Sequence, residues 1–355
     1  MSAALRPFVQ NLWYAAAWEE EVADGQPLGR MLLGQALVLY RIPSTGQYAL
    51  LHDRCPHRFA PLHRGKLVGD SIACPYHGLE FAASGTCVRN PLADEPPRTA
   101  VRSFPVVARH GLVWFWPGDP QQANPSSIPN YAFLDGQEVW RRRSRFAGHH
   151  ELLADNLLDL GHVDFVHTAT FATGGAHARA EQEVTDTGDG GLLVRWTLRE
   201  VFRSTFLEAL FSPAESITQI LEMSWQPPSC MTLSIRYGIT DANGTMVEER
   251  MRMINPHIAT PESQSATHYF WTCFPDAASE AFARAVFDGE DQPMIEAVEQ
   301  YMGGEDFWAL RPAVLPGDAG ALRARRRLMK LRRRESPSGR LDDLAALDDG
   351  DGPLE

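Results

Sequence analysis

Short apolar stretches that alternate with polar residues fill the first third of the chain. Residues 36–42 and 48–54 follow the period of two that half-buried strands show, and the turn sequence Pro-Ser-Thr-Gly-Gln separates them. Residues 106–118 contain a further pair of strand-like segments. The pattern therefore predicts a β-rich N-terminal domain over residues 1–117.

The pattern changes after residue 117. Residues 118–139 form a linker, because this region is rich in proline, asparagine and serine. Long strand-like runs then follow, with turn sequences at 187–191, 227–229 and 241–244. Helical patterns lie near 149–168, 277–288 and 292–302. We expect an α+β fold in which a second domain, residues 140–334, has a broad antiparallel sheet.

Composition narrows the class of protein. The chain has 355 residues, of which 44% are hydrophobic and 22% charged, which is enough for two domains with cores. No apolar run is long enough to span a bilayer, so we expect a cytoplasmic protein with no membrane partner. The formal net charge of −12 argues against nucleic acid as a partner.

The charge is uneven near the C-terminus. Eight of the twelve residues from 323 to 334 are basic, whereas residues 335–355 carry seven acids and one arginine. We expect a disordered acidic tail over 335–355. The basic stretch has two interpretations, a surface for an acidic partner and a solvated helix whose apolar side touches the body, and we favour the second.

The strongest chemical signal is the motif formed by Cys55, His57, Cys74 and His77. Each half supplies one thiolate and one imidazole, which is the ligand set of a Rieske [2Fe–2S] cluster. A Cys2His2 zinc site is the alternative, but it usually has a cysteine pair followed by a histidine pair. The remaining cysteines are expected to be buried free thiols, namely Cys87, Cys230 and Cys273.

A second group of polar residues occurs in the helical segment near 149–168, at Asn156, Asp159, His162 and His167. Two histidines and one carboxylate form the facial triad of non-haem iron(II) oxygenases. The five-residue offset of His162 and His167 does not align them on an ideal helix, so the chain would have to bend near Gly161. Alone, such a pair of histidines is also compatible with ordinary surface or core positions.

Asp291 is the best candidate for the carboxylate of the triad, with Asp288 and Glu290 nearby. It precedes Gln292 and Pro293, where a helix is expected to begin. A helix N-cap is therefore the simplest alternative role for Asp291, because aspartate before a proline at the first helical position is a common cap.

Taken together, these segments resemble the Rieske non-haem iron oxygenases. The similarity is greatest to the compact branch with vanillate O-demethylase, dicamba O-demethylase and toluenesulfonate methyl-monooxygenase. The pattern Asn-x2-Asp-x2-His-x4-His of that family falls on Asn156, Asp159, His162 and His167, and the resemblance extends from residue 11 to about 334. It strengthens the assignment of Asp291.

The resemblance implies a Rieske domain of small antiparallel sheets, a helix-grip catalytic domain, and a ring-shaped homotrimer. One [2Fe–2S] cluster and one mononuclear Fe(II) per subunit are implied as cofactors. Asp159 would be a catalytic residue that bridges His162 to a cluster histidine of the next chain, either His77, which we favour, or His57. Asn156 would be a second catalytic residue of the same segment.

The implied function is that of a terminal oxygenase component that uses O2 to oxidise an aromatic acid, with O-demethylation as the favoured reaction. Methyl or ring hydroxylation is the alternative. Electrons would come from a separate NAD(P)H-dependent flavin/iron–sulfur reductase, because no Gly-rich nucleotide-binding loop opens a helix in this chain.

Two functions from other classes remain open at this stage: a Rieske electron carrier without oxygenase activity, and a ligand-binding module without turnover. Three residues are candidates for contact with the substrate. His268 and Trp271 lie in a strand whose alternation points toward a pocket, and Asn255 is a further candidate donor. Tryptophan in such a strand is also a common core residue.

Overall fold

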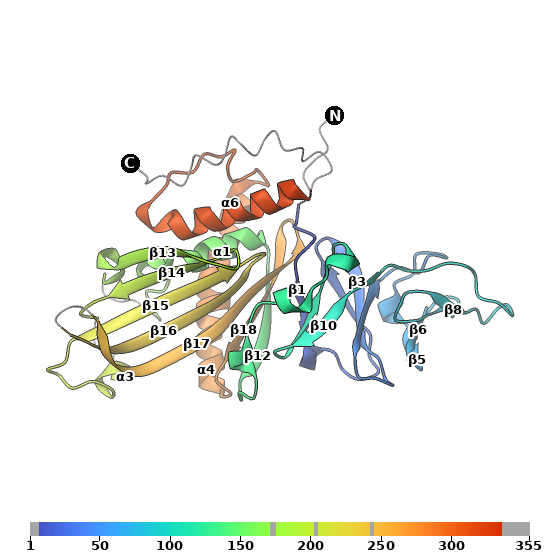
Figure 1. Ribbon diagram of the computed structural model, residues 1–355, viewed down its shortest axis with the longest axis horizontal. Coiled ribbons are helices and arrows are strands. Elements are labelled where there is room, and N and C mark those ends of the chain that lie inside the picture. Colours follow the sequence, from blue (N-terminus) through green and yellow to red (C-terminus); the bar gives the residue numbers. More distant parts are fainter. Residues whose placement is uncertain (1–6, 171–174, 202–204, 242–244, 336–355) are drawn as a thin grey trace.

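Small antiparallel sheets build one end of the molecule, and a single large sheet builds the other (Figure 1). The computed structural model describes residues 7–170, 175–201, 205–241 and 245–335. Residues 336–355, most of the predicted acidic tail, lie outside this part. The prediction of disorder for the tail is therefore not addressed by the described residues.

The N-terminal part contains three sheets, in which every neighbouring pair of strands is antiparallel. The first has the order β1-β11-β10, with β1 Tyr14–Trp18, β10 Val106–Arg109 and β11 Leu112–Phe115. The second has the order β2-β3-β4-β9, with β2 Leu28–Leu32, β3 Gln35–Arg41, β4 Tyr48–His52 and β9 Ser103–Phe104. The third has the order β5-β6-β7-β8, with β5 Lys66–Val68, β6 Ser71–Ala73, β7 Glu80–Phe81 and β8 Cys87–Arg89.

The large sheet has seven antiparallel strands in the order β12-β18-β17-β16-β15-β14-β13. Their bounds are β12 Trp140–Phe146, β13 Glu181–Thr187, β14 Gly191–Leu198, β15 Ile217–Gln226, β16 Cys230–Thr240, β17 Met246–Ser263 and β18 Ala266–Cys273. The three turn sequences expected at 187–191, 227–229 and 241–244 each fall between consecutive strands of this sheet.

Helices cover the large sheet on the side away from the small sheets. The α-helices are α1 His150–Leu158, α2 Val163–Val166, α3 Thr205–Glu208, α4 Ala277–Arg284, α5 Gln292–Met302 and α6 Ala319–Arg334. A π-helical segment, η8 Ala285–Asp291, joins α4 to α5. The 3₁₀ turns are η1 Glu19–Glu21, η2 Leu62–Arg64, η3 Pro120–Gln122, η4 Pro125–Ser127, η5 Ala132–Leu134, η6 Leu160–His162, η7 His177–Arg179 and η9 Pro316–Asp318.

Strand β18 is buried on both faces, and five of its eight residues are apolar. Tyr269 and Trp271 face the core beneath the helices, where most of the apolar residues of the large sheet gather. Phe270, on the opposite face, packs in a separate core with Trp18 and Trp114 of the N-terminal part. Strand β18 therefore contributes to the cores of both parts.

The segment between the two parts, residues 118–139, folds into short turns that pack against both parts. Residues 118–139 contain the 3₁₀ turns η3, η4 and η5, and Tyr131 and Leu134 are buried in the core that joins the two parts. Direct hydrogen bonds add to this joint: Thr260 donates to the carbonyl of Ala15 over 2.8 Å, and the Trp18 indole donates to the carbonyl of Arg142 over 2.9 Å.

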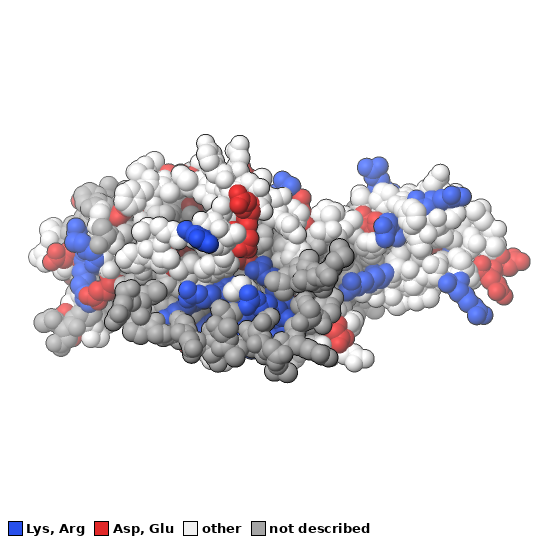
Figure 2. Space-filling view, turned by 90° about the horizontal axis from the view of Figure 1, so that it is seen from above, with Lys and Arg blue, Asp and Glu red and all other residues white. Residues whose placement is uncertain are grey.

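The basic stretch is the helix α6, which packs against α1 and β14. Its arginines gather on the face seen in Figure 2. Arg325 is nevertheless buried, and it pairs with Glu151 over 2.9 Å and with Asp155 over 2.6 Å. These contacts support the interpretation of α6 as a helix that packs on the body.

The remaining cysteines and the length of the apolar helices were also predicted from sequence. Cys87, Cys230 and Cys273 are buried free thiols, as predicted. Within the described ranges, no helix is long and apolar enough to cross a membrane.

Candidate metal centres

Two loops with the same backbone form present Cys55 and Cys74. The amide of each cysteine donates to a carbonyl five residues later, and its carbonyl accepts from an amide four residues later. The fourth residue has a positive φ in both loops, 59° at Phe59 and 75° at Gly78. The proline and glycine residues of the motif, Pro56, Pro75 and Gly78, thus belong to two tight turns that face one another.

The two cysteines of the motif are buried in the protein, and the two histidines lie nearer its surface. Cys55 and Cys74 are buried, whereas His57 is exposed and His77 is half-buried, with their ring centroids 4.5 Å apart. Nδ1 of His77 is buried and has no hydrogen-bond partner among the described residues. Burial raises the pKa of the Cys55 thiol, and a bound metal offsets this by stabilising the thiolate. The arrangement fits a [2Fe–2S] cluster held by two cysteines and two outer histidines.

A break in the predicted helix at 149–168 brings His162 and His167 together. Helix α1 ends at Leu158, Asp159 is extended with φ −114° and ψ 93°, and η6 and α2 follow as short separate turns. The Nε2 atoms of His162 and His167 are 3.3 Å apart as a result. A continuous helix would not have aligned two residues five positions apart.

Asp291 completes the group from a distant part of the chain. Its Oδ1 lies 3.6 Å from Nε2 of His162 and 3.2 Å from Nε2 of His167. Asp291 is the last residue of the π-helical η8, has helical φ and ψ angles, and makes no capping hydrogen bond. The N-cap alternative is therefore excluded by geometry, and the extra residue of the π turn lies at a functional site, as is common for such segments.

These three side chains have the chemistry of a facial triad. Their ligand atoms all lie within 4.8 Å of one another, which is close enough for one divalent ion to contact all three. Burial lowers the pKa of His162, which favours the neutral imidazole that binds metals. Burial acts the same way on His167, but hydrogen bonding to Asp291 and Glu290 outweighs it and raises the pKa of His167.

Neighbouring side chains hold the triad in place. Asn156 donates from Nδ2 to Oδ1 of Asp291 over 3.1 Å. Oε2 of Glu290 lies 2.8 Å from Nδ1 of His167 and accepts from the Thr170 hydroxyl over 2.7 Å. Glu290 was noted in the sequence only as a neighbour of Asp291, and nothing in the pattern singled out Thr170.

Asp159 contacts His162 in a way that the sequence did not predict. The backbone carbonyl of Asp159, not its carboxylate, accepts from Nδ1 of His162 over 2.6 Å. The Asp159 carboxylate accepts instead from the amide of Gly161 over 2.9 Å. The carboxylate also lines a surface hollow with Phe165 and Gly317. The Asp159 side chain is thus half-exposed, and it lies next to the triad, where another molecule can contact it.

A partly open cavity of about 180 Å³ reaches the triad, because His162, His167 and Asp291 belong to its lining. None of the three predicted substrate residues belongs to it. His268 instead contacts the carbonyl of Met31 over 2.9 Å, and the Trp271 indole donates to Ser144 over 3.0 Å. Asn255 lies opposite Leu233 in the sheet. The polar residues of the sheet that do line the cavity are Gln219, Tyr237 and His257.

Comparison with known proteins agrees with this geometry. Residues 12–105 match the Rieske [2Fe-2S] domain family, and residues 146–334 match the vanillate O-demethylase oxygenase C-terminal domain family. The chain belongs to the Rieske non-haem iron oxygenases.

Several relatives of this oxygenase are similar over nearly their whole length. The chloroacetanilide N-alkylformylase oxygenase component of Rhizorhabdus wittichii is 37% identical, with 90% of this chain and 94% of the relative covered. The dicamba O-demethylase oxygenase component of Stenotrophomonas maltophilia is 36% identical, with 93% and 99% covered. The crystal structure of dicamba monooxygenase bound to dicamba superposes with a TM-score of 0.81 at 36% identity, covering 94% of this chain and 99% of that one.

The family settles several of the predictions. The α+β fold, with a Rieske domain and a catalytic domain, is confirmed. The protein is the oxygenase component of a multicomponent system, and its cofactors are a Rieske [2Fe–2S] cluster and a mononuclear iron. A separate reductase therefore supplies the electrons. The electron-carrier and ligand-binding alternatives do not agree with relatives that are oxygenase components.

Proposed function

We propose that this oxygenase removes or hydroxylates an alkyl group of a small aromatic compound, with O-demethylation as the leading reaction. The observation that supports this most directly is the position of His162, His167 and Asp291 in the wall of a largely apolar cavity. An aromatic ring in such a cavity is desolvated and held next to the iron ligands. Relatives that are dicamba and vanillate O-demethylases support the choice of reaction.

The iron, when bound, supplies the activation of O2, and the cluster supplies electrons one at a time. The chain itself holds and orients these groups. Cys55, His57, Cys74 and His77 are proposed as the cluster ligands, and His162, His167 and Asp291 as the iron ligands. Apolar walls exclude water from the reacting carbon. Hydroxylation of a methyl group on oxygen gives a hemiacetal, which breaks down to a phenol and formaldehyde.

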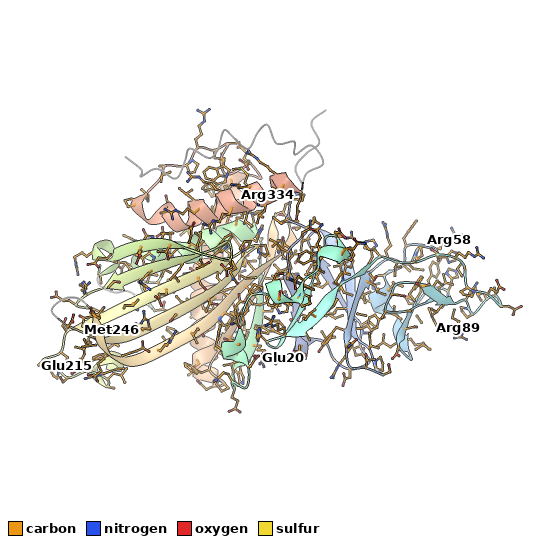
Figure 3. The ribbon with its side chains drawn as sticks, viewed as in Figure 1. Glu20, Arg58, Arg89, Glu215, Met246 and Arg334 are labelled. Atoms are coloured by element: carbon orange, nitrogen blue, oxygen red, sulfur yellow. The ribbon has the colours of Figure 1, made fainter. Side chains whose placement is uncertain are left out.

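A homotrimer is proposed because one chain separates its two centres along its length. Arg58, beside the proposed ligand His57, lies toward one end of the long axis (Figure 3), whereas the proposed iron ligands belong to η6, to the end of α2 and to η8, in the part that contains the large sheet. Electrons would therefore pass from the cluster of a neighbouring subunit. The half-exposed Asp159 carboxylate is the proposed acceptor of contact from His77 of that neighbour.

The reductase is proposed to be an NAD(P)H-dependent flavin/iron–sulfur protein. This follows from the need to split a two-electron hydride donor into single electrons for the cluster. No arginine or lysine is among the described residues that line the cavity, so the aromatic acid predicted from sequence would be bound there by other donors.

The test measures substrate-dependent O2 uptake and formaldehyde release with a surrogate reductase and a panel of methoxyaromatic compounds. We expect one formaldehyde per O2 consumed with a productive substrate. His162→Ala should abolish both signals and remove the mononuclear iron while leaving the cluster spectrum unchanged. His110→Ala, which changes a histidine outside both sites, serves as the matched control. Full turnover in His162→Ala would contradict the assignment.

The alternative reactions are methyl and ring hydroxylation, and product analysis separates them. A hydroxylated product without formaldehyde would identify one of them and would leave the iron-site assignment intact.

A further inference from the structure

The cavity beside the triad follows one strand of the large sheet. Leu233, Ile235 and Tyr237 of β16 all belong to its lining. Side chains two residues apart in a strand lie on the same face of the sheet, so these three form a continuous floor. Leu221 and Gln219 of β15, which lie directly opposite Ile235 and Tyr237, widen this floor. The cavity therefore extends along the sheet in the direction of its strands.

The triad lies at one end of this floor. His257 of β17 is opposite Met231, two residues before Leu233 on β16. The centroid of its ring is 5.4 Å from that of Phe287, which belongs to η8, the segment that ends at Asp291. Both His257 and Phe287 line the cavity. The end of the cavity at His257 is thus the end at which the proposed iron ligands lie.

A polar pair lies at the other end. The residue opposite Gln219 is Tyr237, six residues along β16 from Met231, and this separates the two positions on the strand by about 20 Å. Val201 lines the cavity at the same end, because its amide donates to the carbonyl of Ile217, two residues before Gln219, over 3.1 Å. The cavity therefore connects the triad to a second and distant polar position.

Gln219 and Tyr237 keep a donor and an acceptor in either orientation of the amide. The side-chain amide of Gln219 lies 2.8 Å from the hydroxyl oxygen of Tyr237. If the amide N–H donates, the tyrosine O–H and the amide C=O remain for a ligand. If the amide is turned over, the tyrosine oxygen and the amide N–H remain. Burial raises the pKa of Tyr237 to about 12, so the pair is uncharged.

A hydroxyl group matches this pair, because it donates one hydrogen bond and accepts another. A charged group does not, since the described lining has no lysine or arginine and its one carboxylate is Asp291 at the triad. Between the two ends the floor is apolar, with Leu221, Leu233 and Ile235. An aromatic ring and a hydrocarbon chain lose no hydrogen bonds there.

We propose that this cavity is a slot for an elongated aromatic substrate, whose reacting methyl or methoxy group lies at the triad and whose hydroxyl-type group, carried away from the ring on a chain, bonds to Gln219 and Tyr237. The proposal rests on the proposed function, since that function places an aromatic ring next to the triad. It names the class of substrate as an uncharged single-ring compound with a polar group far from the reacting carbon.

The test compares three pairs of probes built on 4-methoxybenzene. In each alcohol, a para chain of one, three or five CH2 groups ends in a hydroxyl group. Its partner has a methyl group of similar size in place of the hydroxyl, so the partners run from 4-ethylanisole to 4-hexylanisole. Binding to the full-length protein loaded with cluster and iron is measured by calorimetry under anaerobic conditions, so that no turnover occurs.

The preference within each pair should change with chain length. With one CH2 group, the hydroxyl lies against the leucines, and we expect the alkyl compound to bind about tenfold more tightly. At one of the two longer lengths the hydroxyl reaches the polar pair, and the alcohol should bind at least as tightly as its alkyl partner. A constant preference for the alkyl compound at all three lengths overturns the proposal, and so does an absence of binding by both longer alcohols.

Variants then assign the contact. In the double variant Gln219→Leu and Tyr237→Phe, the longer alcohols should lose about tenfold in affinity relative to their alkyl partners, while the shortest pair is unchanged. Tyr237→Phe alone, which keeps the ring, should give part of this loss. Tyr301→Phe, at a position that is 91% exposed, is the matched control. Melting temperature and the cluster spectrum report whether each variant is folded. An equal effect on all three pairs contradicts the assignment.

The two proposals fail in different ways. If the longer alcohols show no advantage but another methoxyaromatic compound is demethylated in a His162-dependent manner, the proposed function stands and this inference falls. If the longer alcohols bind as expected but no aromatic compound supports O2 uptake, the proposed function falls instead.

Discussion

Single hydrogen bonds at the triad decide where its carboxylate points. Asp291 is 5% exposed, Nε2 of His167 lies 3.2 Å from its Oδ1, and the Asn156 amide donates to the same oxygen over 3.1 Å. Without that donor, the carboxylate would be free to adopt other rotamers, and one iron ligand would no longer be held in position. Groups that orient metal ligands typically contribute about 10- to 100-fold in metal affinity.

We therefore expect Asn156→Leu to weaken iron binding by roughly tenfold or more without altering the cluster. The measurement is iron content and Fe(II) affinity by competition with a chelator, with the visible spectrum of the cluster as an internal reference. Asn130→Leu, at an exposed position outside the site, is the matched control. Unchanged iron affinity in Asn156→Leu would show that Asp291 is held by other contacts.

The individual residues of the site also show which of its features can be predicted from sequence and which cannot. The cluster motif was interpretable because its ligands lie in two short loops, each of which has its own turn residues. Asp291 was ambiguous, since the same letters are compatible with an N-cap, and only the π turn distinguishes the two roles. Gln219 and His257 could not be found, because an isolated polar residue in a strand reveals nothing about the neighbouring strands against which it pairs.

At the scale of elements, α6 and α1 are joined by a buried ion-pair cluster. The guanidinium of Arg325 has a side-chain exposure of 6%, and it pairs with Glu151 and Asp155 of α1. Helix α1 leads directly into Asp159 and the triad histidines. The basic helix predicted from sequence thus helps to fix the element that positions the iron ligands.

Arg325→Met should lower the free energy of unfolding by about 3 kcal/mol, because Asp155 loses its cation and the buried Glu151 keeps only Arg332 as a partner. Denaturant unfolding at pH 7 measures this effect. Arg326→Met, on the exposed side of the same helix, should change stability by less than about 0.5 kcal/mol. A similar small effect of both substitutions would mean that water reaches the ion pairs.

At the scale of the whole molecule, Glu21 links the two domains. It pairs with Arg30 of β2 over 2.7 Å and with Arg143 of β12 over 2.9 Å. Burial by itself raises the pKa of Glu21, but hydrogen bonds from Arg30 and Arg143 outweigh it, and the net pKa is lowered. The unfolded chain therefore takes up this proton at a higher pH than the folded one does.

This difference gives a pH-dependent stability. The stabilisation by Glu21 is complete above its unfolded pKa of about 4.3 and is lost as the pH falls through the lower folded value. Glu21→Gln should thus reduce stability at pH 7, and its difference from wild type should shrink as the pH falls below about 4 in urea unfolding. Glu20→Gln, at a more exposed neighbour, should show no such difference at either pH. A constant gap between Glu21→Gln and wild type would contradict the ion-pair explanation.

The proposed trimer makes the sharpest prediction at this scale, because its electron path would cross between chains. Cys74→Ser should remove the cluster and keep the iron, whereas His162→Ala should remove the iron and keep the cluster. Each variant alone should be inactive.

In mixed trimers assembled by co-expression, a chain with a cluster can lie next to a chain with iron, and random assembly gives roughly a quarter of the sites this arrangement. We expect formaldehyde release to recover to about that fraction of wild type, measured per trimer after the oligomer is isolated by size-exclusion chromatography. If the mixed trimers stay inactive while both cofactors are present, electrons pass within one chain. The half-exposed Asp159 would then need another role.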